Sequence, residues 1–244
     1  MSGSFRIFIR SLKYPAAMNK CEQCMVKQFS ALHALTRNEL IRLTVCKTSE
    51  YIKKGQVLFE EGEHLRGIYC IKKGICKLTK LSANGREHIV KLVSRGDLLG
   101  QRSLIGNEAV NLSATAVNDM EICLLPREEI LRSFENNREF SAKVIHEVCH
   151  DLKEAHNSTV NMAQKTVKQR LADTLLYLYH TFGTDQDGYL LVQLTREELA
   201  GMVGTATESL IRILSVLARE QYVATDGKKI RLEQLSGLEK VTLM

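Results

Sequence analysis

The sequence predicts a two-part α+β protein, with a β-barrel or sandwich first and a long helix followed by a compact helical unit after it. Eight of the fifteen glycines lie between residues 55 and 106, and they separate short segments rich in β-forming residues. From Arg138 to Lys165 the chain has no Gly or Pro, and apolar residues recur every three or four positions. The last third combines short amphipathic helical patterns with a hairpin pattern.

Composition limits the class of protein. The chain has 244 residues, 44% hydrophobic and 25% charged, as in globular proteins. It contains no run of about 18 apolar residues, so we expect no membrane-spanning helix. Arg6 and Arg10 interrupt the apolar N-terminal stretch, which argues against a signal peptide. Seven scattered cysteines do not form the pattern of a disulfide framework, so we expect a reducing, cytoplasmic location.

The net charge of +6 does not by itself indicate a nucleic-acid partner. Residues 1–48 carry a net charge of +6, residues 49–165 carry +1 and residues 166–244 carry −1. The surplus therefore belongs to the N-terminus, where residues 1–20 are an expected extension and Met18 is an alternative translation start. A DNA-binding function must rest on a local motif.

The β-rich segment defines the first expected domain, residues 21–135. Ala-Asn-Gly at 83–85 is typical of a hairpin turn, because Asn and Gly accept a positive φ. The strand pattern continues through 111–117 and 121–126, and Pro126 ends it.

Residues 136–165 predict one long helix, with Asn136 and Glu139 as its capped start. Its stripe at coiled-coil spacing indicates a dimerisation helix, and the alternative is a helix packed on its own barrel. A second helix over 166–182 opens a C-terminal domain, residues 166–244, whose α/β unit we expect to end near Leu232. The stripe consists of Phe140, Val144, Val148, Leu152, Ala155, Thr159 and Met162.

Residues 195–217 have the pattern of a helix-turn-helix. Thr195 and Glu198 form a capping box, and Gly204 suits the left-handed turn before a second helix that begins at Thr205 or Ala206. This helix has an apolar face and a polar face, as a helix lying in the DNA major groove does; a generic αα-hairpin is the alternative. The apolar face is Leu210, Ile213, Leu214 and Leu217, and the polar face is Thr207, Glu208, Ile211, Arg212 and Ser215.

Residues 223–232 predict a hairpin that turns at Asp226-Gly227. We expect Lys228, Lys229 and Arg231 at its tip, with the two lysines contacting DNA. A basic wing directly after the helical pair favours DNA binding over the αα-hairpin.

Five motifs in order resemble the Crp/Fnr superfamily of bacterial transcription regulators, and the resemblance covers about residues 20–232. It implies a double-stranded β-helix (a cyclic-nucleotide-binding-like jelly-roll barrel), a long dimerisation helix and a winged helix-turn-helix. It also implies a homodimeric, sequence-specific DNA-binding regulator rather than an enzyme. Its partners would be a pseudo-palindromic operator and, for an activator, RNA polymerase. The motifs are YIKKGQVLFEEGE, IYCIKKGICKLTK, VSRGDLLG, KQRLADTLLYL and LTREELAGMVGTATESLIRIL.

The resemblance assigns roles in DNA reading. Arg212 would donate to a guanine edge and Glu208 would accept from a cytosine amino group. The alternatives are a capping box between Glu208 and Thr205, and a solvated Arg212. Thr207 stands where the cyclic-AMP receptor protein has an arginine, so the half-site need not be the same.

The resemblance places Gly96, Asp97 and Leu98 at the effector pocket. Cyclic-AMP-binding members follow a Gly-Glu pair with a phosphate-binding Arg-Ser pair. Residues 107–110, which align with the second pair, contain no arginine, and Glu108 would repel a phosphate. We therefore expect no binding of a cyclic nucleotide.

Cys21, Cys24 and Cys123 resemble ligands of the oxygen-sensing iron–sulphur motif of the Fnr branch, whose remaining ligand falls near Ser30. Because a cubane cluster takes four thiolates, we expect no cofactor and no metal. The alternative is an iron–sulphur or thiol-based sensor of oxygen or nitric oxide, completed by another cysteine such as Cys46 or Cys76. The cysteines expected to be buried as small apolar residues are Cys46, Cys70, Cys76 and Cys149.

Two further hypotheses carry less support. A thioredoxin-like enzyme would place its CxxC near a βαβ unit, which the sequence around residue 21 lacks. A signalling module whose helical tail contacts only protein differs from a regulator in its failure to bind DNA. His146 and His150 have metal-ligand spacing on the long helix, but a solvated face explains them better.

Overall fold

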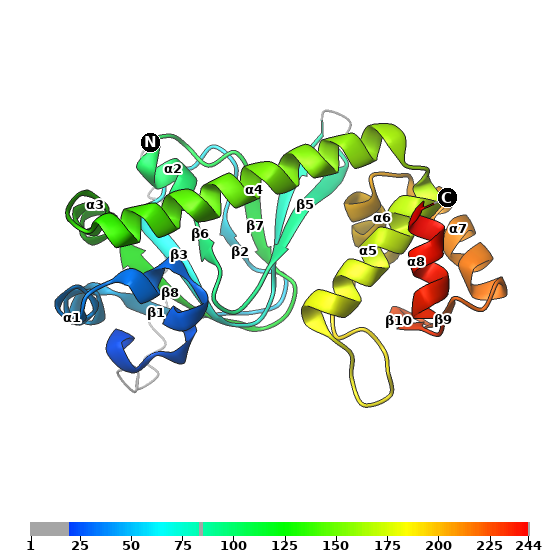
Figure 1. Ribbon diagram of the computed structural model, residues 1–244, viewed down its shortest axis with the longest axis horizontal. Helices are drawn as coiled ribbons and strands as arrows, with labels where there is room; N and C mark the ends of the chain where they lie inside the picture. The colour runs from blue at the N-terminus through cyan, green and yellow to red at the C-terminus, as the bar shows by residue number, and fades with distance from the viewer. Residues whose placement is uncertain (1–19, 83–84, 244) are drawn as a thin grey trace, which may run out of the picture.

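The computed structural model describes residues 20–82 and 85–243. The barrel lies at one end, the C-terminal domain lies at the other, and one long helix, α4, runs along both (Figure 1). Three short 3-10 turns and helix α1 precede the barrel, and a capping box between Thr36 and Glu39 starts α1. These elements are η1 (Cys21–Gln23), η2 (Met25–Phe29), η3 (Ala31–Ala34) and α1 (Arg37–Cys46).

Two four-stranded antiparallel sheets form the barrel, in the orders β1-β8-β3-β6 and β2-β7-β4-β5. Alternate residues of β3 face opposite sides: Ile71 enters the core between the sheets, while Cys70 faces a second core under the N-terminal turns. The predicted fold class is confirmed; residues 83–84 of the predicted hairpin turn lie outside the described residues. The strands are β1 (Thr48–Ile52), β2 (Val57–Phe59), β3 (Gly67–Lys73), β4 (Cys76–Leu81), β5 (Glu87–Val93), β6 (Leu98–Leu99), β7 (Ser113–Ala116) and β8 (Met120–Pro126).

The helices of the barrel domain are α2 (Gln101–Ile105) and α3 (Arg127–Asn136), and α4 (Arg138–Gln164) follows directly. The cap of α4 differs from the prediction by one residue. Asn137, not Asn136, accepts from the Phe140 backbone N–H at 3.0 Å, because Asn136 is the last residue of α3. Asn136 instead donates to the Arg132 carbonyl.

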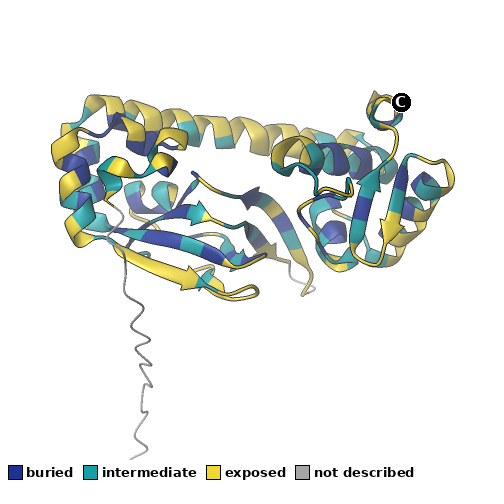
Figure 2. Ribbon diagram, turned by 90° about the horizontal axis from the view of Figure 1, so that it is seen from below, coloured by how far each residue is buried: buried dark blue, intermediate teal, exposed yellow. Residues whose placement is uncertain are grey.

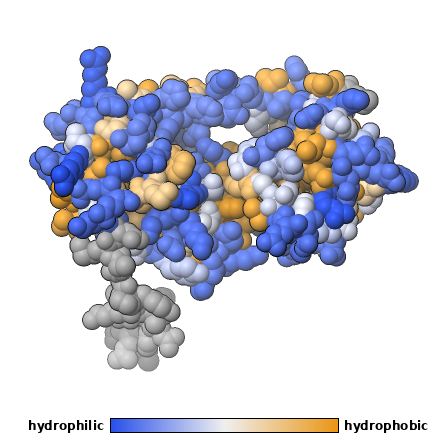
Figure 3. Space-filling view, turned by 60° about the horizontal axis from the view of Figure 1, so that its bottom comes forward, coloured by the Kyte–Doolittle hydropathy of each residue, from blue (hydrophilic) through white to orange (hydrophobic). Residues whose placement is uncertain are grey.

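The residues of the predicted stripe of α4 lie in two different environments. Phe140 and Val144 are buried against the chain's own barrel, which corrects their assignment to a dimer seam. Residues 152–160 are all exposed, and this part of the helix stands clear of both domains (Figure 2). Hydrophilic residues cover most of the face shown in Figure 3, and its apolar surface forms separate patches.

The folded unit of the C-terminal domain continues beyond its expected end near Leu232. A last helix, α8, follows the hairpin, buries Leu238 and Val241 and packs on α5. Gly237 lies against the Tyr222 ring, where a Cβ would come within 2.5 Å, so this glycine allows close packing within a helix. The elements are α5 (Val167–Phe182), α6 (Arg196–Val203), α7 (Thr207–Arg219), β9 (Val223–Asp226), β10 (Lys229–Leu232) and α8 (Leu235–Leu243).

Within the described ranges, no helix alone has the length and apolar character needed to cross a membrane; α6 and α7 meet that test only as a pair bent by 94°.

Candidate DNA-binding surface and sensor pocket

The turn between α6 and α7 is built from local interactions. The Glu198 backbone N–H donates to Thr195 Oγ1 at 3.0 Å, and the Thr195 N–H donates to the Glu198 carboxylate at 2.9 Å, so the predicted capping box forms. Gly204 adopts φ +71° at the end of α6, as predicted. The Arg170 guanidinium, from α5, donates to the carbonyls of Val203 and Gly204 and fixes the turn to the rest of the domain.

Helix α7 presents the predicted polar face to solvent. Leu210, Leu214 and Leu217 are buried, which fixes the rotation of the helix. The helix is capped at Ala206 without a side-chain hydrogen bond, so the alternative capping box between Thr205 and Glu208 does not form. Thr207 is half-buried, and the other polar-face residues are exposed: Glu208, Ile211, Arg212 and Ser215. This face is free to enter a groove of DNA.

The hairpin β9–β10 forms a wing beside α6. Gly227 has φ +54° in its turn, and Lys228 is exposed there. Lys229 and Arg231 both stack over the Tyr189 ring, at 5.2 and 5.3 Å from its centroid. Arg231 also pairs with Glu233, so it anchors the base of the wing and does not lie at the tip, contrary to the prediction.

Arg196 is a residue that sequence analysis missed. From the first turn of α6 it donates to the Gly227 carbonyl at 2.7 Å and so joins the helix-turn-helix to the wing. Its other terminal nitrogen, Nη1, is buried and has no hydrogen-bond partner among the described residues. The contact between Arg196 and the turn of the wing could not be predicted, because the residues next to Arg196 in the sequence give no sign of it.

The predicted effector residues lie under the N-terminal turns. Gly96 has φ +99°, and a Cβ there would come within 2.5 Å of the Phe29 Cβ. Asp97 accepts from the Ser94 N–H at 2.6 Å, and burial raises the pKa of its carboxyl. Leu98 belongs to the core that contains Cys70.

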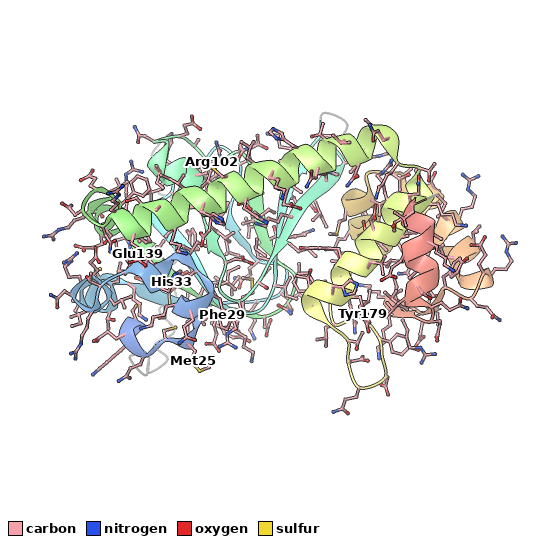
Figure 4. The ribbon with its side chains drawn as sticks, viewed as in Figure 1. Met25, Phe29, His33, Arg102, Glu139 and Tyr179 are labelled. Atoms are coloured by element: carbon pink, nitrogen blue, oxygen red, sulfur yellow. The ribbon has the colours of Figure 1, made fainter. Side chains whose placement is uncertain are left out.

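The chain does contain an Arg-Ser pair, but it lies nearer to Gly96 in the sequence than residues 107–110, which align with the phosphate-binding pair. Arg102 and Ser103 lie in α2, on the side of the barrel away from Phe29 (Figure 4). The Arg102 guanidinium donates to Glu108 at 3.2 Å and to Asn111 at 2.9 Å, and Ser103 is buried. Glu108 therefore pairs with Arg102, and the other arginine that contacts this stretch, Arg127, donates to the Asn107 side chain at 3.0 Å.

Four cysteines line one small cavity of about 20 Å³, between η1, α1 and the first sheet. Cys70 lies directly opposite Cys123 across the β3–β8 pair, and Cys21 and Cys24 approach from the N-terminal turns. The sequence analysis named Cys46 or Cys76 as the cysteine that could complete this group of four. Both lie elsewhere, since Cys46 is exposed on α1 and Cys76 belongs to the core between the sheets. Three lysines also line the cavity: Lys27, Lys47 and Lys72.

The exposure of the cysteines differs from the prediction at two positions. Cys70 and Cys76 are buried, as expected, and burial raises the pKa of each thiol to about 12. Cys46 and Cys149 are exposed, because each lies on the solvent side of a helix whose other side is packed.

The thiol cavity does not fit an iron–sulphur cluster in this arrangement. A volume near 20 Å³ holds about one water molecule, far less than a cubane of four irons and four sulphides. Among the residues that the structure describes, no three His, Cys, Asp or Glu side chains are arranged to hold a metal ion. The donor types suit a soft metal, but a cluster would require the N-terminal turns to move outwards.

An antiparallel β-barrel joined through one long helix to a winged helix-turn-helix defines a two-domain DNA-binding protein. Residues 49–137 match the family described as cyclic nucleotide-binding domain, and residues 169–241 match the Crp-like helix-turn-helix domain. The chain belongs to the Crp/Fnr family and is a DNA-binding transcription regulator.

Relatives that match most of the chain include a CRP-like regulator and a fumarate and nitrate reduction regulator. One is a "CRP-like cAMP-activated global transcriptional regulator" of Mycobacterium tuberculosis, 25% identical over 189 residues, covering 77% of this chain and 84% of that protein. Another is the "Fumarate and nitrate reduction regulatory protein" of Vibrio cholerae, 24% identical over 231 residues, covering 90% and 91%. The structure of FixK2 from Bradyrhizobium japonicum has the same fold, with a TM-score of 0.71 at 21% identity over 80% of this chain and 96% of that one.

Proposed function

We propose that the protein acts as a homodimer that binds a pseudo-palindromic operator in the bacterial cytoplasm, with α7 of each protomer in the major groove. The observation that carries the proposal is the exposed polar face of α7, in a domain attached to a long helix whose residues 152–160 are all exposed. Ile145, Leu152 and Val160 are 53%, 56% and 50% exposed on α4, spaced seven and eight residues apart. Apolar residues at that spacing suit a parallel pairing of two helices.

In this proposal, the polar face of α7 reads the bases and the wing contacts the phosphates. Arg212 would donate to a guanine and Glu208 would accept from a cytosine, while Thr207, Ile211 and Ser215 complete the surface against the groove. Lys228 and Lys229 would contact backbone phosphates. An activator of this type would also contact RNA polymerase, and no catalytic reaction is part of this proposal.

DNA binding is tested with an operator selected from random duplexes, by fluorescence anisotropy at two salt concentrations. We expect selective binding that weakens as salt rises, because lysines and arginines displace counterions from the phosphates. Equal affinity for selected and scrambled duplexes would overturn sequence-specific binding. The absence of any DNA binding would favour a signalling module that contacts only protein.

We infer that cyclic AMP is not the signal, although the Mycobacterium tuberculosis relative is named as cAMP-activated. Arg102 is paired with Glu108, and Arg127 donates to Asn107 in the stretch where a phosphate was expected. Calorimetric titration should detect no saturable binding of cyclic AMP to the wild-type protein. Saturable binding at micromolar cyclic AMP would contradict the inference, and a Glu108→Ser variant tests whether that carboxylate is the obstacle.

We infer that the protein works without an iron–sulphur cluster, in line with the missing thiol at Ser30 and the small cavity. One observation nevertheless favours a second candidate, a thiol-based or iron–sulphur sensor: Cys70 brings a fourth thiol to Cys21, Cys24 and Cys123. Iron and acid-labile sulphide are measured per protomer after anaerobic purification. We expect neither; near-stoichiometric amounts of both, lost in Cys70→Ala but kept in Cys76→Ala, would establish the second candidate.

A further inference from the structure

Lys77 is a buried lysine that lies between the two domains. It belongs to β4 of the barrel, and only 11% of its side chain is exposed. Its ammonium group lies 2.6 Å from Glu87 of β5 and 3.2 Å from Glu198 of α6. One cation therefore joins a carboxylate of the barrel to a carboxylate of the helix-turn-helix.

Glu198 has two functions in this arrangement. Its Oε2 accepts from the Thr195 N–H and completes the capping box, while its Oε1 faces Lys77. The start of α6 is thus held by the same carboxylate that contacts the barrel. A shift of α6 would leave the buried ammonium with one partner fewer, which is costly in a desolvated site.

The backbones approach closely at the same place. Gly201 of α6 lies against β5, where a Cβ would come within 2.5 Å of the Glu87 carbonyl oxygen. Ile89 of β5 shares one apolar core with Leu199 and Val203 of α6. The contact is therefore built from an ion triad, a glycine and a joint apolar core.

We propose that Lys77, with Glu87 and Glu198, is an interdomain latch that fixes α6 on the barrel and so positions the recognition helix α7 for DNA. The inference rests on the proposed function. Two recognition helices must meet two half-sites at a fixed separation, so a freely moving domain would bind more weakly. The latch gives the barrel a direct route to the helix-turn-helix, besides the chain connection through α4 and α5.

The test uses the full chain, with Lys77→Met, Glu198→Gln and the double variant. Met keeps the length of the lysine stem without its charge. Gln at the third helical position preserves a capping box, so α6 keeps its start. Lys80→Met is the matched control, because Lys80 lies on the same strand and pairs with Glu61 of the same domain, on its surface. Thermal unfolding verifies that each variant is folded.

Two quantities are measured: affinity for the selected operator, and amide hydrogen exchange of residues 85–93 and 196–203. We expect each single variant to lose about tenfold in affinity, in the range typical of coupled sites, and to exchange faster in both segments. The double variant should match Lys77→Met, because removal of the ammonium group already abolishes the contact with Glu198. Lys80→Met should match the wild type.

Unchanged affinity and exchange in Lys77→Met would overturn the latch. So would additive losses in the double variant, or a gain in affinity, which would mean that the contact holds α7 away from DNA. Should the wild-type protein bind no selected operator, the proposed function fails, while the exchange measurement still tests the latch.

Discussion

Arg212 combines exposure with a fixed direction, because Leu210 and Leu214 hold the opposite side of α7 in the core. We expect Arg212→Ala to weaken operator binding by the loss of one bidentate base contact, about 1–3 kcal/mol, and to relax the preference at that base pair. Anisotropy titrations against the operator and single-base variants measure both effects.

Arg219→Ala is the matched control for Arg212→Ala, since Arg219 is an exposed arginine in the last turn of the same helix. It should retain base preference. If Arg212→Ala binds as tightly and selectively as wild type, α7 does not read DNA through this residue.

Glu39 links the N-terminal region to the start of α4. Burial raises the pKa of its carboxyl, but hydrogen bonds from Thr36 and Asn137 outweigh burial and hold the pKa below its ordinary value of 4.5. The folded state therefore favours the ionised form. This contribution to stability is present above pH 4.5 and is lost as the pH falls through the folded-state pKa.

The free energy of unfolding should accordingly be higher in wild type than in Glu39→Gln near neutral pH, and the difference should shrink below pH 4.5. Urea titrations at several pH values measure it. Glu135→Gln, at an exposed position on α3, should show no such trend. A difference that stays constant or grows on acidification would contradict the assignment.

Residues whose partners lie within one helical turn were predictable. The capping box of Thr195 with Glu198 and the positive φ of Gly204 formed as expected, because both depend on local geometry. Cys70 and Lys77 were not identified as site residues. Cys70 meets Cys123 through strand register, and Lys77 meets Glu198 through domain docking, neither of which leaves a local pattern.

Among the elements, α4 carries the clearest prediction about assembly. Leu152 is an exposed apolar residue in the uncovered part of the helix. We expect Leu152→Asp to convert a dimer to a monomer, because it loses about 1.5–3 kcal/mol of burial per protomer and places like charges together in the seam. Sedimentation equilibrium measures the change.

Asn157→Asp controls for added charge, since Asn157 is exposed on α4 but turned away from Leu152 by the helical repeat. It should remain dimeric. A wild-type protein that is already monomeric at micromolar concentration, or a Leu152→Asp variant that stays dimeric, would contradict the assigned seam.

The sequence predicted the helical period of α4, but it did not predict which residues of the helix pack on the barrel. The spacing of Phe140 and Val144 matches that of Leu152, yet the first two pack on the barrel and the third is uncovered. Helix α8 was missed for a different reason, since it is short and contains Gly237, a residue that disfavours helices unless close packing compensates.

For the whole molecule, the order of barrel, long helix and winged helix-turn-helix followed from the motifs, and the family matches agree with it. The way in which α6 rests on β5 did not follow, because docking depends on complementary surfaces that are distant in sequence. This docking places the barrel in direct contact with the first helix of the helix-turn-helix.

Hydroxyl-radical footprinting on a selected operator, combined with the mass of the complex, tests the central claim most directly. The claim predicts two protomers on one duplex and two protected half-sites related by a two-fold axis, about one helical turn apart. A single asymmetric protected stretch occupied by one protomer would contradict it.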